Sequence, residues 1–200
     1  MRFADLKNDF VFRKIFGSHT HLTMALLNDV LAFEGPQRIE TLELLSPEQR
    51  PDLMGAKLSI LDVKCRDQSG RWFVVEMQML HVEGFLNRVV FNAARAYTSQ
   101  LGRGDLYSAL ADVIAVSFCD FVLWPDAPRA QSGQTKVPLV SRWAMQERVS
   151  GAQDLLQIQY AFVELPKASM TESARTPAEQ WAWLFRVGEF EGALPLSATA

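Results

Sequence analysis

The feature that most constrains the fold is the stretch KLSILDVKCRDQSGRWFVVEMQ at residues 57–78, in which two apolar segments flank a short polar turn. Branched and aromatic residues favour strands in both segments, and Gly70 suits the left-handed position of a three-residue hairpin loop. The stretch therefore predicts a β-hairpin. Each predicted strand carries a carboxylate where a core strand would hold Val or Ile, namely Asp62 in SILDV and Glu76 in FVVEMQ.

The register of this hairpin predicts that the two acids face each other. Asp62 and Glu76 each stand seven residues from Ser69, so a turn centred on Ser69 places them opposite one another. Directly opposed side chains on one face have Cβ atoms roughly 4.5–5.5 Å apart. The same register predicts two further pairs, Ile60 with Gln78 and Lys64 with Val74.

Two opposed carboxylates need a compensating partner, because like charges directly opposite each other destabilise a sheet. That partner can be a cation, a shared proton or a nearby Lys or Arg. A divalent metal suits the arrangement, since one or two carboxylates hold it while water and substrate phosphate fill its other positions. Gln78 shares the face of Glu76 and can donate to a phosphate oxygen or orient a water. In the simpler alternative, both acids face solvent at a sheet edge or pair with lysines.

Composition indicates an ordinary globular chain. It has 200 residues, of which 48% are hydrophobic and 22% charged. This length favours one domain, which we expect at residues 1–188, with residues 189–200 as a flexible tail. The first ten residues show no signal peptide, and Cys65 and Cys119 lie far apart without metal-binding spacing. These features predict a protein of the reducing cytoplasm.

Helical and strand patterns alternate along the chain and predict an α/β or α+β fold, with a central mixed sheet and helices on its faces. Helical periodicity and end signals mark four helices, expected at residues 8–17, 18–33, 84–104 and 176–188. Besides the hairpin, strand patterns mark residues 38–45, 112–124, 137–148 and 156–165.

The charge distribution restricts how the chain can bind nucleic acid. A net charge of −3 excludes a basic surface over the whole protein, so DNA binding must depend on a local patch. The segment 85–104 contains arginines and no acid, and its first two arginines fall on one helix face. The candidate phosphate contacts are Arg88, Arg95 and Arg103 of this segment, with Lys57 and Lys64 of the hairpin. The N-terminal segment adds four more candidates, Arg2, Lys7, Arg13 and Lys14. A solvated helix face is the alternative.

Four stretches of the sequence resemble one known family, the recombination-promoting nuclease (Rpn) or transposase family of the PD-(D/E)XK nuclease superfamily. They follow in order along the chain. The stretches are NDFVFRKIFG, KLSILDVKCRDQSGRWFVVEMQ, NRVVFNAARAYTSQLGRGDLY and LQIQYAFVELPK. Each alone is a weak signal, whereas four in order at plausible spacing favour membership.

This resemblance implies a restriction-endonuclease-like fold and Mg²⁺-dependent (or Mn²⁺-dependent) hydrolysis of DNA, with a role in recombination or mobile elements. By position, Asp62 and Glu76 are the implied metal ligands. Gln78 takes the place of the superfamily lysine, as is common in this family. Asp9, at the start of the first predicted helix, is the implied additional acid. Cleavage of both DNA strands would favour a homodimer by symmetry.

Two other functions are compatible with the sequence. One is a non-catalytic DNA- or protein-binding module that keeps the nuclease fold, which the acidic isoelectric point of about 5.6 and the short C-terminal region favour. The other is a small-molecule metallohydrolase, which would need a closed pocket in place of a basic groove. The arginine-bearing helix disfavours the latter.

Overall fold

The computed structural model describes residues 5–49, 59–126, 136–169 and 176–187, so the expected tail at 189–200 lies outside the described residues. Its main element is a six-stranded sheet with the strand order β1-β4-β5-β6-β8-β7. The strands are β1 (Leu42–Leu45), β4 (Val63–Asp67), β5 (Trp72–Gln78), β6 (Val113–Cys119), β7 (Val140–Trp143) and β8 (Ile158–Glu164). Strands β5, β6 and β8 run parallel and the other pairs are antiparallel. The predicted mixed sheet is confirmed.

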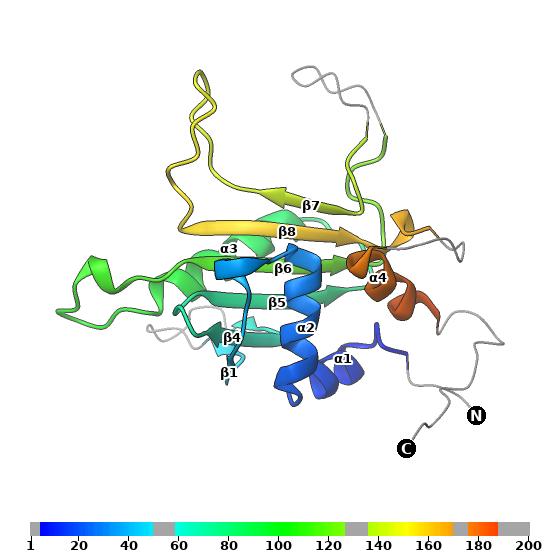
Figure 1. The fold of residues 1–200 in the computed structure, drawn as a ribbon, viewed down its shortest axis with the longest axis horizontal. Helices are drawn as coiled ribbons and strands as arrows, with labels where there is room; N and C mark the ends of the chain where they lie inside the picture. Colours follow the sequence, from blue (N-terminus) through cyan, green and yellow to red (C-terminus); the bar gives the residue numbers. More distant parts are fainter. Residues whose placement is uncertain (1–4, 50–58, 127–135, 170–175, 188–200) are drawn as a thin grey trace.

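Helices cover both faces of this sheet. They are α1 (Asp9–Phe16), α2 (Thr20–Leu31), α3 (Phe85–Thr98) and α4 (Pro177–Val187), with short 3-10 helices at Gly35–Gln37, Tyr107–Ala109 and Leu165–Lys167. In Figure 1, α2 lies across the front of the sheet and α3 lies behind β6 and β8. No helix in the described ranges is long and apolar enough to cross a membrane.

The core divides into two clusters, one on each face of the sheet. Aromatic residues of α1 and α4, such as Phe12 and Phe185, pack with α2 against the front face. Phe85 and Val89 of α3 pack against the other face. Because strand side chains alternate, β5 sends one set of residues to each cluster.

The alternation along β5 decides where its carboxylate lies. Phe73, Val75 and Met77 belong to the cluster under α1, α2 and α4. Val74 belongs to the cluster under α3. Glu76 is two residues beyond Val74 and therefore faces α3. A buried acid on this face is therefore expected to form its hydrogen bonds with side chains of α3.

Local sequence signals explain where α1 and α4 begin. Asn8 caps α1, since its side-chain oxygen accepts from the backbone N–H groups of Phe10 at 3.0 Å and Val11 at 3.3 Å. Because Asn8 fills the cap, the carboxylate of Asp9 stays in the first turn of the helix. Thr176 and Glu179 bond each other's backbone N–H groups at the start of α4, which is a capping box.

Several predicted elements are longer than the observed ones; the strand expected at 137–148, for example, covers only Val140–Trp143, and that at 38–45 only Leu42–Leu45. Two further differences involve α3 and β6. The helix expected to reach residue 104 ends at Thr98, and the strand expected at 112–124 covers Val113–Cys119. Gln100 explains the first difference, because its side-chain amide bonds both the N–H and the carbonyl of Ala111 and ties the chain to the start of β6. The segment carrying Arg103 is consequently a turn.

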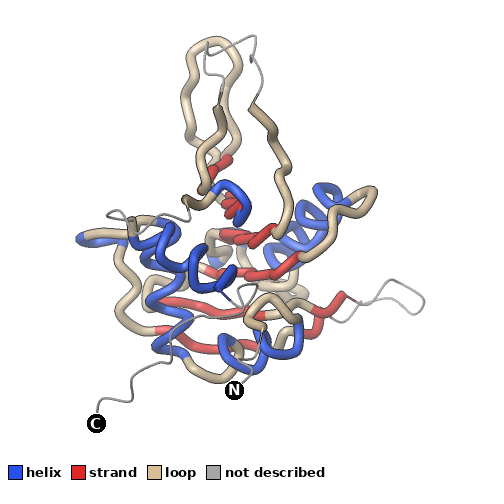
Figure 2. The backbone as a smooth tube through the Cα atoms, turned by 90° about the vertical axis from the view of Figure 1, so that its right-hand side faces the viewer, coloured by secondary structure: helices blue, strands red, loops and turns tan. Residues whose placement is uncertain are grey.

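The connections at one edge of the sheet extend from the body of the protein. Residues 144–157 join β7 to β8, and Figure 2 shows this loop rising away from the sheet. The hairpin of β4 and β5 lies nearer the opposite edge, next to β1. The loop at 144–157 is therefore attached at the far side of the sheet from this hairpin.

Candidate active site

The hairpin forms in the predicted register. Lys64 pairs with Val74, and Val63 with Val75. Gly70 closes the turn with a φ of 89°, a left-handed conformation that glycine adopts without steric cost. Turn chemistry therefore fixes the register, as the sequence indicated.

The first predicted strand does not continue through Asp62, which corrects one prediction. Strand pairing stops at Val63, and the chain bends at Asp62. Ile60 pairs with Glu48 in a separate two-stranded sheet of β2 (Glu48–Gln49) and β3 (Ser59–Ile60), and not with Gln78. The predicted strand pairing of Asp62 with Glu76 is therefore absent, although the two residues remain neighbours.

A side-chain hydrogen bond accounts for the bend. In a continued ladder, Leu61 would face Met77 and its carbonyl would accept the N–H of Met77. Instead, Oδ2 of Asp62 accepts that N–H at 2.8 Å. The carboxylate replaces a backbone acceptor, so the chain does not need to follow the ladder at Asp62, just before β4 begins.

Asp62 is buried, and each of its two carboxylate oxygens accepts a hydrogen bond. Besides Met77, it accepts from Nη2 of Arg13 at 2.9 Å, so α1 contributes a cation to the site. Burial raises the pKa of Asp62, the bonds from Met77 and Arg13 lower it, and the nearby charge of Asp9 raises it further. Burial has the largest effect on the pKa of Asp62, so a further cation nearby would stabilise the ionised form of this carboxylate.

Glu76 faces α3 and is also buried. Its Oε1 accepts from Nδ2 of Asn92 at 2.7 Å. Burial raises the pKa of Glu76, the charge of Arg88 lowers it, and the charge of Asp62 raises it again. Asp62 nevertheless lies near Glu76, because it accepts the N–H of Met77, the residue that follows Glu76. In the described part of the chain, Oε2 of Glu76 accepts no hydrogen bond.

Gln78 ends β5 beside the same helix. Its Oε1 accepts from Nη2 of Arg88, and its Nε2 donates to the carbonyl of Leu80 at 2.8 Å. The N–H of Asp120 donates to the backbone carbonyl of Gln78. This arrangement lies at the carboxyl ends of the parallel strands β5 and β6, where open α/β sheets generally bind ligands.

The other predicted site residues are distributed more widely. Asp9 lies near Asp62, as its electrostatic effect there shows. Lys64 is buried, its Nζ lies 4.4 Å from the centre of the Trp72 ring, and burial lowers the pKa of Lys64. Arg95 lies over the ring of Phe91 on α3. Arg103 is exposed in the turn after α3, and Lys57 lies outside the described residues.

Two partners of the acids were not predicted from the sequence in these roles. Asn92 interrupts the apolar stripe of α3 at a position that is 2% exposed. A buried side-chain amide on a helix requires a polar partner, so the position of Asn92 in this stripe indicated that it contacts another polar group. Arg13 joins Asp62 across 49 residues of sequence, and no local pattern indicates that contact.

The residues present fit a divalent metal held mainly by water and substrate. Among the described residues, no group of three or more His, Cys, Asp or Glu side chains is placed to hold a metal ion. Asp62 and Glu76 supply two hard oxygen ligands, and burial destabilises the charge on both. Mg²⁺ is commonly bound through one or two carboxylates, with waters and phosphates as the remaining ligands.

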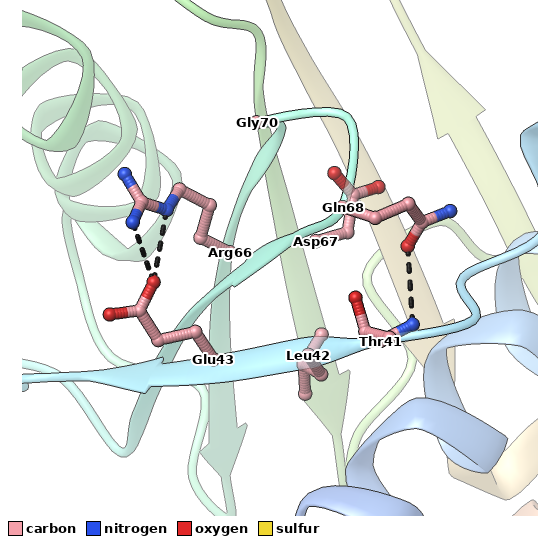
Figure 3. A pocket seen from close by; sticks show the side chains of 7 residues that line it. All are labelled: Thr41, Leu42, Glu43, Arg66, Asp67, Gln68 and Gly70. Atoms are coloured by element: carbon pink, nitrogen blue, oxygen red, sulfur yellow. Dashed lines mark hydrogen bonds and ion pairs between the residues drawn. The ribbon is translucent and has the colours of Figure 1, made fainter.

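A surface hollow lies at the other end of the hairpin. Figure 3 shows it beside the turn, where Arg66 and Glu43 form an exposed ion pair of 2.6 Å. Its lining consists of Thr41, Leu42, Glu43, Arg66, Asp67, Gln68 and Gly70. Neither Asp62 nor Glu76 contributes to it, so this hollow is separate from the paired acids.

The raised pKa of Glu76 predicts a stability difference that depends on pH. An ionised Glu76 destabilises the metal-free native state, so Glu76→Gln should raise the free energy of unfolding at pH 7 by about 1 kcal/mol. This cost is absent well below the ordinary pKa of 4.5, grows as the pH rises through the higher native pKa, and is complete above it.

Thermal unfolding in chelator at pH 4 and pH 7 measures this difference. We expect nearly equal melting temperatures at pH 4 and a higher one for Glu76→Gln at pH 7. The exposed Glu43 provides a matched control, since Glu43→Gln should change stability little at either pH. A Glu76→Gln variant that is less stable than wild type at pH 7 would contradict the raised pKa.

The fold and the paired acids define an α/β protein with a buried acidic pair at the carboxyl end of its sheet. The family model for the PD-(D/E)XK nuclease family transposases matches residues 6–191. The chain therefore belongs to this family, which confirms the resemblance seen in the sequence. No curated protein and no solved structure matches the chain.

Proposed function

We propose that this protein is a divalent-metal-dependent endonuclease that hydrolyses phosphodiester bonds in DNA. One observation supports it above all: two buried acids lie near each other, because Asp62 accepts the N–H of Met77, the residue that follows Glu76. Burial also raises the pKa of both acids. Perturbed acids at a functional position of the fold are typical of catalytic sites. Membership of a nuclease family supplies the substrate class. The metal of this proposal is Mg²⁺ or Mn²⁺, held by Asp62 and Glu76.

The chain's own residues have distinct roles in this proposal. When bound, the metal lowers the pKa of a coordinated water and polarises the scissile phosphate. Asn92 holds Glu76 in place through its hydrogen bond. Arg88 lies beside Glu76 and Gln78, where its charge can stabilise the extra negative charge of the transition state. The amide of Gln78 is placed to orient the attacking water, and Asp9 is the proposed additional acid.

Supercoiled plasmid DNA provides the direct test of the reaction. Incubation with Mg²⁺ or Mn²⁺ should convert it to nicked or linear forms, and excess chelator should stop the conversion. The order of products also shows whether one strand or both are cut. A folded wild-type protein that leaves the plasmid intact with either metal would contradict the proposed activity.

We assign phosphate contacts to Arg88, Arg95 and Arg103 on and after α3, of which Arg88 lies nearest the acids and is exposed. Arg88→Ala should weaken binding to a DNA duplex about equally for all sequences and reduce the slope of log affinity against log salt by about one. Fluorescence anisotropy at several salt concentrations in chelator measures both quantities. Arg66→Gln is the control, because it removes one arginine charge from an exposed ion pair near the hairpin turn. An unchanged salt slope for Arg88→Ala would exclude a phosphate contact.

A DNA-binding module without activity is the second candidate. The observation that favours it is that both oxygens of Asp62 already accept hydrogen bonds from Arg13 and Met77. Retained DNA binding without metal binding would support this alternative. A cytoplasmic location, a domain spanning residues 1–188 and a homodimer that cuts both strands stay predictions.

A further inference from the structure

Arg13 holds a specific position in the site that the proposed function does not explain. It projects from α1, and its Nη2 lies 2.9 Å from Oδ1 of Asp62. The other oxygen of Asp62 is bonded to the N–H of Met77 at 2.8 Å. Both oxygens of one proposed metal ligand therefore already face a protein donor in the absence of metal.

The two donors differ in how readily they can leave. The N–H of Met77 belongs to the backbone of β5 and is fixed by the sheet. The side chain of Arg13 is 43% exposed, whereas that of Asp62 is 10% exposed. A partly exposed ion pair contributes little net stability, because solvent screens it and its long side chain loses conformational freedom. Arg13 can therefore exchange its partner without disturbing the fold.

Charge determines the direction of this exchange. A divalent cation at Asp62 would attract the carboxylate more strongly than a guanidinium does and would repel the guanidinium. Once displaced, a guanidinium prefers an anionic partner with two oxygens that accept parallel hydrogen bonds, and a phosphate provides them. A bound DNA strand places such phosphates next to the metal.

We propose that Arg13 is an exchangeable counter-ion of Asp62, which pairs with that carboxylate in the metal-free protein and transfers to a DNA phosphate when a divalent metal binds. This inference rests on the proposed function. It makes Arg13 a positioning residue that couples metal binding to DNA binding. The coupling keeps Asp62 paired with a cation until the metal binds.

Binding of Mn²⁺ without DNA provides the first test, because it needs no catalytic activity. Titration followed by electron paramagnetic resonance should show tighter Mn²⁺ binding for Arg13→Gln than for wild type, by roughly tenfold, since a nearby cation is removed. Arg66→Gln changes the same residue type at an exposed ion pair and should bind Mn²⁺ as wild type does. Asp62→Asn should bind Mn²⁺ much more weakly.

Binding to a DNA duplex, recorded by stopped-flow anisotropy before cleavage, tests the second half of the transfer. Mn²⁺ should increase the affinity of wild type for DNA more than that of Arg13→Gln, because only wild type gains the phosphate contact. Arg13→Lys keeps the charge but loses the bidentate geometry, so it should retain wild-type Mn²⁺ affinity and part of the gain. This variant also serves if Arg13→Gln unfolds.

The outcomes separate the two proposals. If wild type binds Mn²⁺ through Asp62 but Arg13→Gln has the same Mn²⁺ affinity, the exchange is wrong and the nuclease proposal stands. Equal gains in DNA affinity for wild type and Arg13→Gln would likewise overturn the transfer. Wild-type protein that binds no Mn²⁺ through Asp62 would overturn the exchange together with the proposed metal site.

Discussion

Asp62→Asn and Glu76→Gln should each lower the rate of DNA cleavage by about 1,000-fold or more while the protein stays folded. Both changes keep the shape of the side chain and remove the negative charge that holds the metal. Loss of a metal ligand removes several kcal/mol of transition-state stabilisation, and each 1.36 kcal/mol corresponds to tenfold in rate. The measurement is single-turnover plasmid cleavage at saturating Mg²⁺.

A double variant sharpens this test. If Asp62 and Glu76 hold one metal, removing both should be hardly worse than removing either, because residues that act as a unit are not additive. Arg66→Gln, which alters the hairpin far from the acids, should cleave at the wild-type rate. Either single variant retaining more than about a tenth of wild-type activity would contradict a shared metal site.

Glu164→Ala should have the largest effect on stability, about 3–5 kcal/mol, because it leaves Lys167, whose side chain is only 10% exposed, without its counter-ion. Glu164 is 0% exposed at the end of β8. Its Oε1 accepts from Nζ of Lys167 at 2.7 Å, and its Oε2 accepts from the N–H groups of Leu123 and Trp124. Lys167 also donates to the carbonyls of Trp124 and Val137. One carboxylate thus anchors the segments that follow β6 and precede β7.

Urea unfolding at pH 7 measures this effect, and an exposed ion pair supplies the comparison. Glu43 pairs with Arg66 at the surface, where its side chain is 57% exposed, so Glu43→Ala should cost less than about 1 kcal/mol. Glu164→Gln should cost less than Glu164→Ala, because the amide oxygen can still accept one bond. Equal costs for Glu164→Ala and Glu43→Ala would show that the buried network does not stabilise the fold.

The hairpin shows how far sequence could determine the site. The position of Gly70 and the alternation of β5 fix a register in which Lys64 meets Val74, and both signals are local. The bend at Asp62 was not predictable from that pattern. It depends on the bond from the N–H of Met77, fifteen residues away, to a carboxylate that competes with the backbone. The alternation of strand residues in a sequence does not indicate where a side chain will replace a backbone carbonyl as hydrogen-bond acceptor.

The residues that contact the two acids were also not predictable from local sequence patterns. Arg13 and Arg88 are both basic residues on helices, and nothing local indicates that one pairs with Asp62 and the other with Gln78. Lys64 is a candidate DNA contact because it is near the acids in sequence, and the structure packs it on Trp72 in a buried position. Tertiary packing decides these outcomes, because a long side chain can reach several partners from one backbone position.

One metal ion between Asp62 and Glu76 is central to the proposed site. Crystals soaked in Mn²⁺ and measured for anomalous scattering locate that ion directly. We expect a single strong peak bonded to an oxygen of each acid at roughly 2.0–2.2 Å, with the Arg13 guanidinium moved away from Asp62. A peak bound elsewhere on the chain, with Asp62 still paired to Arg13, would contradict the proposed site.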